Sequence, residues 1–306
     1  GPIVEPSFKA WWGVPDMPKV NFESDGARQW ALDVTKHWIE NFDIDGWRMD
    51  VAKELDFSFW KEFRDIAYAT KKDVLLISEI FGDTSQWLQG DRFDGTMNYS
   101  FRETMTDYFA TKRINNKEFA DSLANLYSMY SFEALSSCQN LLSSHDVKRF
   151  LNRCGNNQDG ILGAIFLQAT FPGIAGVYYG DEVGLGGADD PFNREPFPWN
   201  NEESWNKTIL EFTKSMMQIK NVNPIFKYGR FELLDYEENV VIFRRILQDE
   251  SLICIVNRDR ITNDIIIPSN AHSIDILYGD CEANLEDGSV KITKNAGDVG
   301  IILHEQ

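Results

Sequence analysis

The stretch Ile44-Asp45-Gly46-Trp47-Arg48-Met49-Asp50 begins like a buried strand and ends with charged residues, where a strand gives way to a loop. Successive side chains of an extended chain point to opposite faces, so Arg48 and Asp50 share one face. An unpaired buried charge is very costly, and the Arg48 guanidinium is therefore expected to pair with Asp50 and keep it ionised. Such a pair suits a nucleophile, a charged stabiliser or a purely structural ion pair, and spacing alone leaves these open.

The sequence around this stretch alternates between helical and extended patterns. Apolar periodicity predicts helices over 25–39, 57–68, 100–112, 116–130, 161–170 and 204–221. Strands are predicted over 44–50, 74–79, 93–99, 135–142 and 173–179. Strands that alternate with helices imply parallel pairing with helices outside, which is an α/β fold. From about 228 the pattern changes to short strands at 240–243, 252–256, 265–267, 274–277 and 300–303, which predicts a small antiparallel β-sandwich domain.

Composition narrows the classes of partner. The 306 residues include 30 Lys and Arg against 48 Asp and Glu, a formal net charge of -18, which argues against nucleic acid or an anionic membrane. Four scattered cysteines form no metal spacing or disulfide framework, no apolar run reaches transmembrane length, and no signal peptide is visible. We therefore expect a cytoplasmic protein. Gly1-Pro2 resembles the remnant of a protease cleavage site, so we expect the natural N-terminus to be absent.

Charged residues recur at the carboxyl ends of the predicted strands. Asp50 ends the first strand, Glu79 the second, His145-Asp146 the fourth and Asp181-Glu182 the fifth. In parallel α/β architectures, and in (β/α)8 barrels above all, this end carries the active site. Each residue also has a structural interpretation: Glu79 as a helix cap, His145 as a core histidine and Glu182 as a solvated helix start. Four such residues at the same edge favour a site.

The chemistry that fits paired carboxylates is glycoside cleavage. This reaction needs one carboxylate as the nucleophile and one carboxylic acid that protonates the leaving oxygen. A third carboxylate can grip sugar hydroxyls and favour the oxocarbenium-like state. Asp50 beside Arg48 suits the ionised role, whereas Glu79 follows an apolar strand and precedes Ile80-Phe81, surroundings that favour the protonated form.

Three motifs carry a family resemblance. The run from Ile44 to Ala52 resembles the nucleophile motif of the α-amylase family, glycoside hydrolase family 13. Ile77-Ser78-Glu79-Ile80-Phe81 is similar to its acid/base motif, and Leu141-Leu142-Ser143-Ser144-His145-Asp146 to its third-carboxylate motif. Met17-Pro18-Lys19-Val20-Asn21, Ser144 before His145, and the run from Asp190 to Trp199 resemble the neopullulanase, cyclomaltodextrinase and maltogenic amylase group.

The resemblance implies a role for each matching residue. Asp50 would be the nucleophile, Glu79 the acid/base and Asp146 the transition-state stabiliser. The implied substrate-binding residues are Arg48, His145, Lys53, Phe81 and Arg194. Lys53 stands where the narrower group often has Asn, near the leaving-group sugar, which leaves bond preference open. The implied reaction is retaining hydrolysis of α-1,4 glucosidic bonds in an α-glucan oligosaccharide, with some α-1,6 cleavage or transfer.

The family barrel has eight strands, and this sequence supplies five, which match the fourth to the eighth. The resemblance therefore implies a truncated (β/α)8 TIM-barrel-type domain over 24–227. Residues 1–23 would be the tail of the protruding loop region, and 228–306 the C-terminal β domain. A first strand without a lateral partner favours pairing with another chain, either a second copy or a missing N-terminal half. We expect at best weak activity from this chain alone.

Two other functions stay open at this stage. The first is a catalytically silent, carbohydrate-binding or scaffolding relative, although all three carboxylates are present, which favours enzyme ancestry. The second is a metal-dependent hydrolase built on His145, Asp146, Asp181 and Glu182. The four histidines form no ligand-like pairs, so we expect no metal and no cofactor. The family admits Ca²⁺, but no loop here has a recognisable oxygen-ligand spacing.

Overall fold

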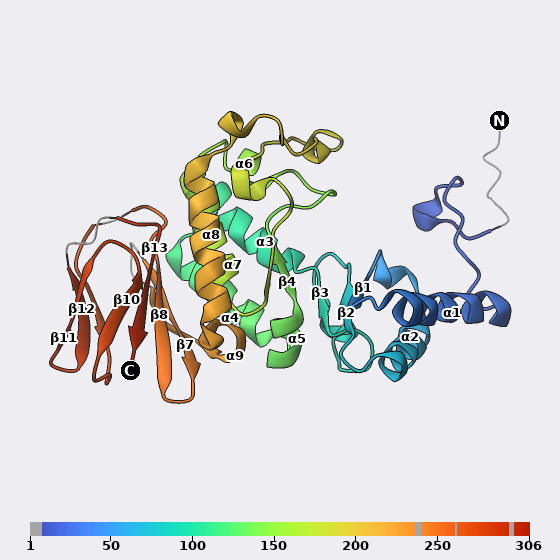
Figure 1. Cartoon of the computed structure of the whole chain (residues 1–306), viewed down its shortest axis with the longest axis horizontal. Helices are drawn as coiled ribbons and strands as arrows, with labels where there is room; N and C mark the ends of the chain where they lie inside the picture. Colours follow the sequence, from blue (N-terminus) through green and yellow to red (C-terminus); the bar gives the residue numbers. More distant parts are fainter. Residues whose placement is uncertain (1–7, 237–239, 261, 294–296) are drawn as a thin grey trace. The chain divides into compact units, whose positions relative to one another are not determined.

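The computed structural model describes residues 8–236, 240–260, 262–293 and 297–306, and the chain divides into two compact units (Figure 1). The first unit ends at Thr96 and the second begins at Met97. Two of the three candidate carboxylates, Asp50 and Glu79, belong to the first unit. The third, Asp146, belongs to the second.

The first unit is a parallel sheet with two helices. Its strands are β1 (Gly46–Met49), β2 (Leu75–Ser78) and β3 (Gly95–Thr96), paired in the order β1-β2-β3. The helices are α1 (Asp25–Phe42) and α2 (Phe57–Thr70). Asp56 caps α2 by accepting a hydrogen bond from the Phe59 N–H, and the apolar face of α2 is buried through Phe59, Trp60, Phe63 and Ala67.

Helix α1 has two apolar faces. Leu32, Thr35 and Ile39 are buried on one face, and α1 packs against α2. Trp30, Trp38 and Phe42, which are eight and four residues apart, are exposed. Side chains at these spacings lie on the same side of a helix, and the Trp38 and Phe42 ring centroids are 4.6 Å apart. We call these three rings the α1 aromatic row.

The second unit contains the remaining helices and two further parallel strands. The helices are α3 (Tyr99–Met105), α4 (Asn116–Ser128), α5 (Phe132–Ser137), α6 (Phe150–Arg153), α7 (Gln158–Thr170), α8 (Lys207–Val222) and α9 (Pro224–Tyr228). Strand β4 (Gln139–Leu141) pairs with β5 (Ile174–Gly176). Met97, directly after β3, forms a parallel bridge to Gln139, and the Asn98 N–H donates to the Gln139 carbonyl at 2.8 Å. Helix α7 is buried from Gly160 to Thr170.

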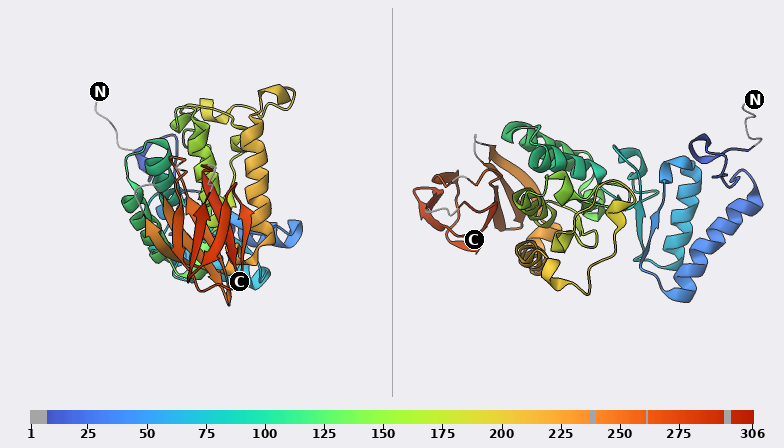
Figure 2. Two further views of the ribbon diagram at one scale, coloured as in Figure 1. Left: turned by 90° about the vertical axis from the view of Figure 1, so that its left-hand side faces the viewer. Right: turned by 90° about the horizontal axis from the view of Figure 1, so that it is seen from above.

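The C-terminal part of this unit is antiparallel, as the sequence predicts. One sheet has the order β10-β13-β8-β7-β6 and the other the order β11-β12-β9. Their bounds are Arg230–Tyr236 (β6), Val241–Leu247 (β7), Glu250–Val256 (β8), Ile265–Pro268 (β9), Ile274–Tyr278 (β10), Glu282–Glu286 (β11), Ser289–Thr293 (β12) and Gly300–Glu305 (β13). Side chains from both sheets share one apolar core, and the larger sheet packs against α4, α7 and α9 (Figure 2).

The observed elements differ from the predicted ones in three places. Helix α5 occupies the start of the strand predicted at 135–142, so β4 is only three residues long. The strand predicted at 93–99 is cut to two residues because the Asn98 side chain caps α3 by accepting from the Phe101 N–H. Strands β6, β11 and β12 were not predicted. In β11 the charged ends Glu282 and Glu286 are exposed, which hides its strand alternation among polar residues.

Gly46 lets β1 and β2 approach closely. A Cβ built on Gly46 would lie 2.2 Å from the Leu75 carbonyl oxygen, which belongs to the backbone of the paired strand and cannot rotate away. We predict that Gly46→Ala lowers the free energy of unfolding by about 1–3 kcal/mol, measured by urea titration. Gly26→Ala is the control, because nothing lies within 4 Å of its Cβ position. Equal stability of the two variants would contradict the required close approach.

Candidate active site

The parallel register of β1 and β2 brings Asp50 and Glu79 together. Met49 pairs with Ser78, so the residues that follow leave neighbouring strands at the same level. The Glu79 N–H donates to the Met49 carbonyl at 2.9 Å, which extends the ladder by one residue. Asp50 and Glu79 therefore emerge side by side at the carboxyl edge of the sheet, where the sequence predicts a site.

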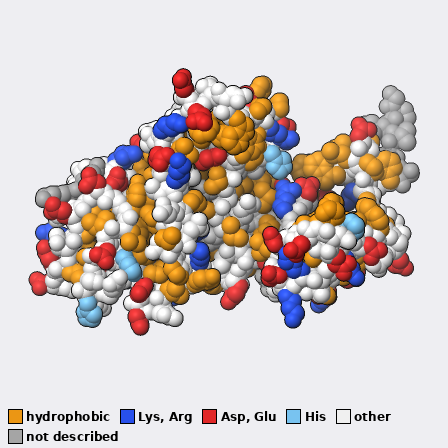
Figure 3. All heavy atoms as spheres, viewed as in Figure 1, with side chains coloured by type: hydrophobic (Ala, Val, Ile, Leu, Met, Phe, Trp, Pro, Cys, Tyr) orange, Lys and Arg blue, Asp and Glu red, His pale blue; other side chains and the backbone are white. Residues whose placement is uncertain are grey.

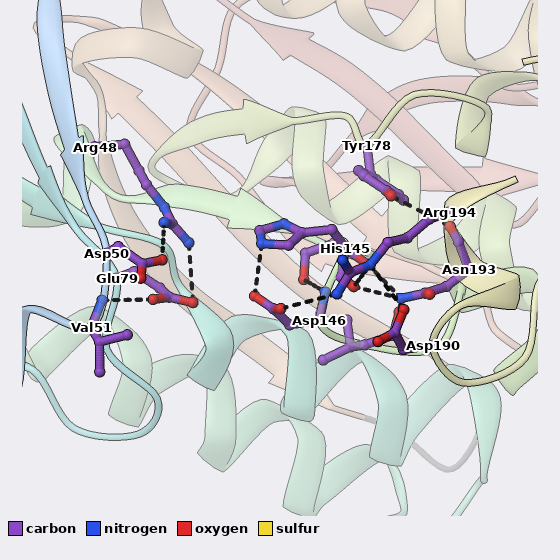
Figure 4. Close-up of polar contacts among 12 residues, drawn as sticks. Arg48, Asp50, Val51, Glu79, His145, Asp146, Tyr178, Asp190, Asn193 and Arg194 are labelled. Carbon is purple, nitrogen blue, oxygen red and sulfur yellow. Dashed lines mark hydrogen bonds and ion pairs between the residues drawn. The ribbon is translucent and has the colours of Figure 1, made fainter. Parts of the chain in front are cut away.

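The Arg48 guanidinium joins the two carboxylates (Figure 4). Its Nη1 lies 2.6 Å from Asp50 Oδ1, and its Nη2 lies 3.1 Å from Glu79 Oε1. The Asp50 side chain is 72% exposed and the Glu79 side chain only 6%. Period-two alternation predicts the Arg48–Asp50 pair, and the structure confirms it. The contact between Arg48 and Glu79 was not predicted, because it depends on the register between two strands that are distant in sequence.

The turn after β1 supplies a second contact to Glu79. The Val51 N–H donates to Glu79 Oε2 at 2.9 Å, and the Ala52 N–H donates to the Glu79 carbonyl at 3.2 Å. Val51 has φ 43, a left-handed conformation that costs a residue with a Cβ about 1–2 kcal/mol. Such strain is concentrated at functional sites. Val51 was missed by sequence analysis because nothing in its identity signals a left-handed turn.

These donors change the expected environment of Glu79. Glu79 is buried, and a guanidinium and a backbone N–H both contact its carboxyl group. In this geometry Glu79 Oε1 forms an ion pair with Arg48, and Glu79 Oε2 accepts a hydrogen bond from the Val51 N–H.

The second unit carries the His145–Asp146 pair. His145 Nε2 lies 3.1 Å from Asp146 Oδ2, and Arg194 Nη2 lies 3.8 Å from Asp146 Oδ1. Arg194 Nε also donates to the His145 carbonyl at 2.9 Å. The His145 side chain is about half exposed, so the interpretation as a core histidine is wrong. Arg194 approaches Asp146 from the loop between β5 and α8, as Figure 4 shows.

Asn193 anchors this loop to the turn that holds His145 and Asp146. Its side chain is buried, and its Nδ2 donates to the His145 carbonyl at 2.8 Å and the Val147 carbonyl at 3.0 Å. Tyr178 donates to the Asn193 carbonyl at 3.4 Å. Two acceptors from one turn restrict its movement. Only the family resemblance pointed to this loop, and it did not single out Asn193.

Arg149 is a buried cation beneath the same loop. Its Nε donates to the Asn193 carbonyl at 3.1 Å, and its Nη1 donates to the Tyr179 carbonyl at 2.7 Å. The same Nη1 lies 3.3 Å from Asp181 Oδ1. Burial raises the pKa of Asp181 to about 7, although Ser143 and Arg149 act in the opposite direction. Asp181 is thus a buried partner of Arg149.

The other predicted substrate-binding residues lie in the first unit. Lys53 is exposed on the 3-10 turn Ala52–Glu54, directly after the strained Val51. Phe81 follows Glu79 by two residues and is exposed. The structure thus places Arg48, Lys53 and Phe81 in the unit that holds Asp50 and Glu79. His145 and Arg194 lie with Asp146 in the other unit.

In the part of the chain that the structure describes, no group of three or more His, Cys, Asp or Glu side chains is arranged to hold a metal ion. No helix within the described ranges is long and apolar enough to cross a membrane.

Comparison with known proteins identifies the class of catalytic domain and the family to which this chain belongs. The family model described as the α-amylase catalytic domain matches residues 8–228, so this part of the chain has the fold of a glycoside hydrolase domain. The chain belongs to the α-amylase family, which confirms the resemblance drawn from its three motifs. The native-form structure of the debranching enzyme of Nostoc punctiforme matches with a TM-score of 0.88 at 30% identity, over 96% of this chain and 65% of that one.

The curated relatives of this chain include a neopullulanase and a cyclomaltodextrinase. The chain is 36% identical over 286 residues to neopullulanase 2 of Thermoactinomyces vulgaris, which covers 92% of this chain and 48% of the relative. It is 35% identical over 280 residues to a cyclomaltodextrinase of Geobacillus thermopakistaniensis, covering 90% of this chain and 47% of the relative. The chain thus spans about half the length of these curated relatives.

Asp181 predicts a pH dependence of stability. Its pKa is about 7 in the folded state against 3.8 ordinarily, so between pH 4 and 7 the unfolded chain releases a proton that the folded chain retains. The contribution of Asp181 to the free energy of unfolding is complete below pH 4. It falls as the pH rises to 7, by up to about 1.4 kcal/mol per pH unit. Asp181→Asn should remove this fall, so its stability relative to the wild type should rise from pH 4 to 7 in urea titrations. The control is Asp189→Asn, whose carboxylate is largely exposed. A pH-independent difference for Asp181→Asn would contradict the assignment.

Proposed function

We propose that this chain is the C-terminal part of a (β/α)8 catalytic domain, in which β1 to β5 are barrel strands four to eight. The domain would be a retaining α-glucoside hydrolase. Its substrates would be maltooligosaccharides, cyclodextrins, pullulan or starch, with α-1,4 and some α-1,6 cleavage. The observation that carries the proposal is the pairing of Asp50 and Glu79 at adjacent strand ends under one guanidinium, in a chain of the α-amylase family.

The proposed reaction has two steps. Asp50 attacks the anomeric carbon and forms a glycosyl ester, while Glu79 gives its proton to the leaving oxygen. Glu79 then removes a proton from water, whose oxygen displaces Asp50 and restores the α configuration. Asp50 is open to substrate and Arg48 fixes the direction of its carboxylate. Because Arg48 also contacts Glu79, the acid step requires the Arg48–Glu79 contact to loosen when the glycosidic oxygen approaches.

Asp146 would supply the third carboxylate. It is partly exposed, and His145 and Arg194 lie against its two oxygens. A carboxylate that lies between an imidazole and a guanidinium is placed to accept hydrogen bonds from sugar hydroxyls. In this proposal Asp146 favours the distorted, oxocarbenium-like sugar, and His145 and Arg194 hold it in place and contact the substrate. Lys53 and Phe81 would contact the leaving-group side.

We also propose that an N-terminal half, with barrel strands one to three, completes the domain. The chain spans about half the length of its relatives, and the α1 aromatic row is exposed. Three exposed aromatic rings along one helix make an apolar surface of the kind that another part of a domain covers. Residues 1–23 would then belong to the loop region, 24–227 to the barrel and 228–306 to the C-terminal β domain. This chain alone would have weak or no activity.

The test is hydrolysis of maltotriose and cyclodextrin by the chain, with and without a co-expressed N-terminal half taken from a full-length relative. We expect activity only in the completed protein, with the α-anomer as the first product in NMR spectra. Asp50→Asn and Glu79→Gln should each lower kcat by about 10²–10⁴-fold. Asp45→Asn is the control, because its carboxylate lies at the other end of the stretch and is exposed.

Three results would oppose parts of this proposal. A β-anomer as the first product would contradict retention. Full activity in Asp50→Asn would contradict the nucleophile assignment. Binding of maltooligosaccharide without hydrolysis, in a completed protein that folds, would favour the alternative of a catalytically silent, carbohydrate-binding relative.

A further inference from the structure

The loop between β5 and α8 presents two aromatic rings to solvent. Phe192 is 60% exposed and Trp199 is 72% exposed. Figure 3 shows hydrophobic side chains gathered on the surface in the upper part of the view, where this loop lies. Two large exposed rings on one loop offer apolar surface that a ligand could cover.

The ring of Trp199 is supported from behind. Its centroid lies 4.3 Å from that of Phe197, and the Phe197 ring lies 5.4 Å from Trp205 in an edge-to-face arrangement. Trp205 Nε1 donates to the Pro198 carbonyl at 3.1 Å, and the Trp199 N–H donates to the Phe197 carbonyl at 2.8 Å. A ring held in this way loses little conformational freedom when a ligand covers it, which makes it a preorganised surface.

The base of the loop is fixed as well. Lys207 lies over the Trp205 ring at 4.8 Å, and the Asn206 N–H donates to the Val183 carbonyl at 2.9 Å. The Asn206 side chain accepts from the Ile209 N–H and caps α8. The loop is therefore tied at Asn206 and, further back, at the buried Asn193, with Trp199 between the two anchors.

The same loop reaches the third carboxylate. Arg194 Nη2 lies 3.8 Å from Asp146 Oδ1, and Trp199 follows Arg194 by five residues. Five residues span at most about 18 Å, a distance that a chain of a few sugar residues can cover. A ligand that contacts Asp146 and Arg194 can therefore also extend to Trp199.

We propose that Trp199, backed by Phe197, is a stacking platform for a sugar residue of an α-glucan, beyond the residues held at Asp146. The apolar C–H face of a neutral pyranose ring fits a flat, uncharged aromatic face. The identity of the ligand rests on the proposed function, whereas the platform itself rests on the exposure and support of Trp199. The platform would favour long substrates over short ones.

The experiment is calorimetric titration of this chain with maltotriose and with maltoheptaose. Trp199→Ala should weaken binding of maltoheptaose about tenfold and leave binding of maltotriose unchanged. Trp199→Phe should restore most of the loss. Trp12→Ala is the matched control, because Trp12 is also 72% exposed but lies in the other unit, and it should bind like the wild type.

Two outcomes would overturn the inference. One is equal affinity of wild type and Trp199→Ala for maltoheptaose, including the case in which neither binds. The other is a dimer of the wild type that Trp199→Ala dissociates without any change in glucan binding, since a second copy of the chain would then be the partner. Failure of the hydrolysis assay leaves this result unaffected, because binding is measured without turnover.

Discussion

One guanidinium, that of Arg48, sets the geometry of the site in the first unit. The parallel register of β1 and β2 places two carboxylates at neighbouring strand ends, where they repel each other when both are ionised. Arg48 forms an ion pair with both, and its planar group can do so because it offers several N–H groups in fixed directions. Gly46, in the same strand, allows the strand approach on which this register depends. The close approach of β1 and β2 is thus required both for the sheet and for the placement of Asp50 beside Glu79.

In the second unit, a buried cation and a buried amide hold the backbone around His145 and Asp146. Arg149 and Asn193 donate to carbonyl groups of the turn after β4 and of the loop between β5 and α8. These groups would otherwise be buried without partners, at a cost of roughly 1–3 kcal/mol each. The network holds His145 and Asp146 on a fixed turn, while Arg194 and Trp199 of the same loop face outward. A rigid interior thereby supports the exposed loop that carries Arg194 and Trp199.

Local patterns in the sequence predict much of this arrangement. Period-two alternation predicts that Arg48 and Asp50 pair, and helical spacing predicts α1, α2 and α7 closely. The contacts of Glu79 with Arg48 and Val51 could not be predicted, because they depend on strand register and on a left-handed turn. Asn193 was missed for a similar reason, since a buried amide in a polar loop has no sequence signal. The roles of Asp50, Glu79 and Asp146 remain predictions that rest on family membership.

The central claim is that Arg48 holds Asp50 and Glu79 together, and a double-mutant cycle on Arg48 and Glu79 tests it most directly. The free energy of unfolding would be measured in urea at pH 7 for the wild type, Arg48→Met, Glu79→Gln and the double variant. Arg48→Met alone should cost about 1–3 kcal/mol, because it leaves the buried Glu79 side chain without the guanidinium that contacts it. In the Glu79→Gln background the same change should cost at least about 1 kcal/mol less. Strictly additive effects would contradict the claim.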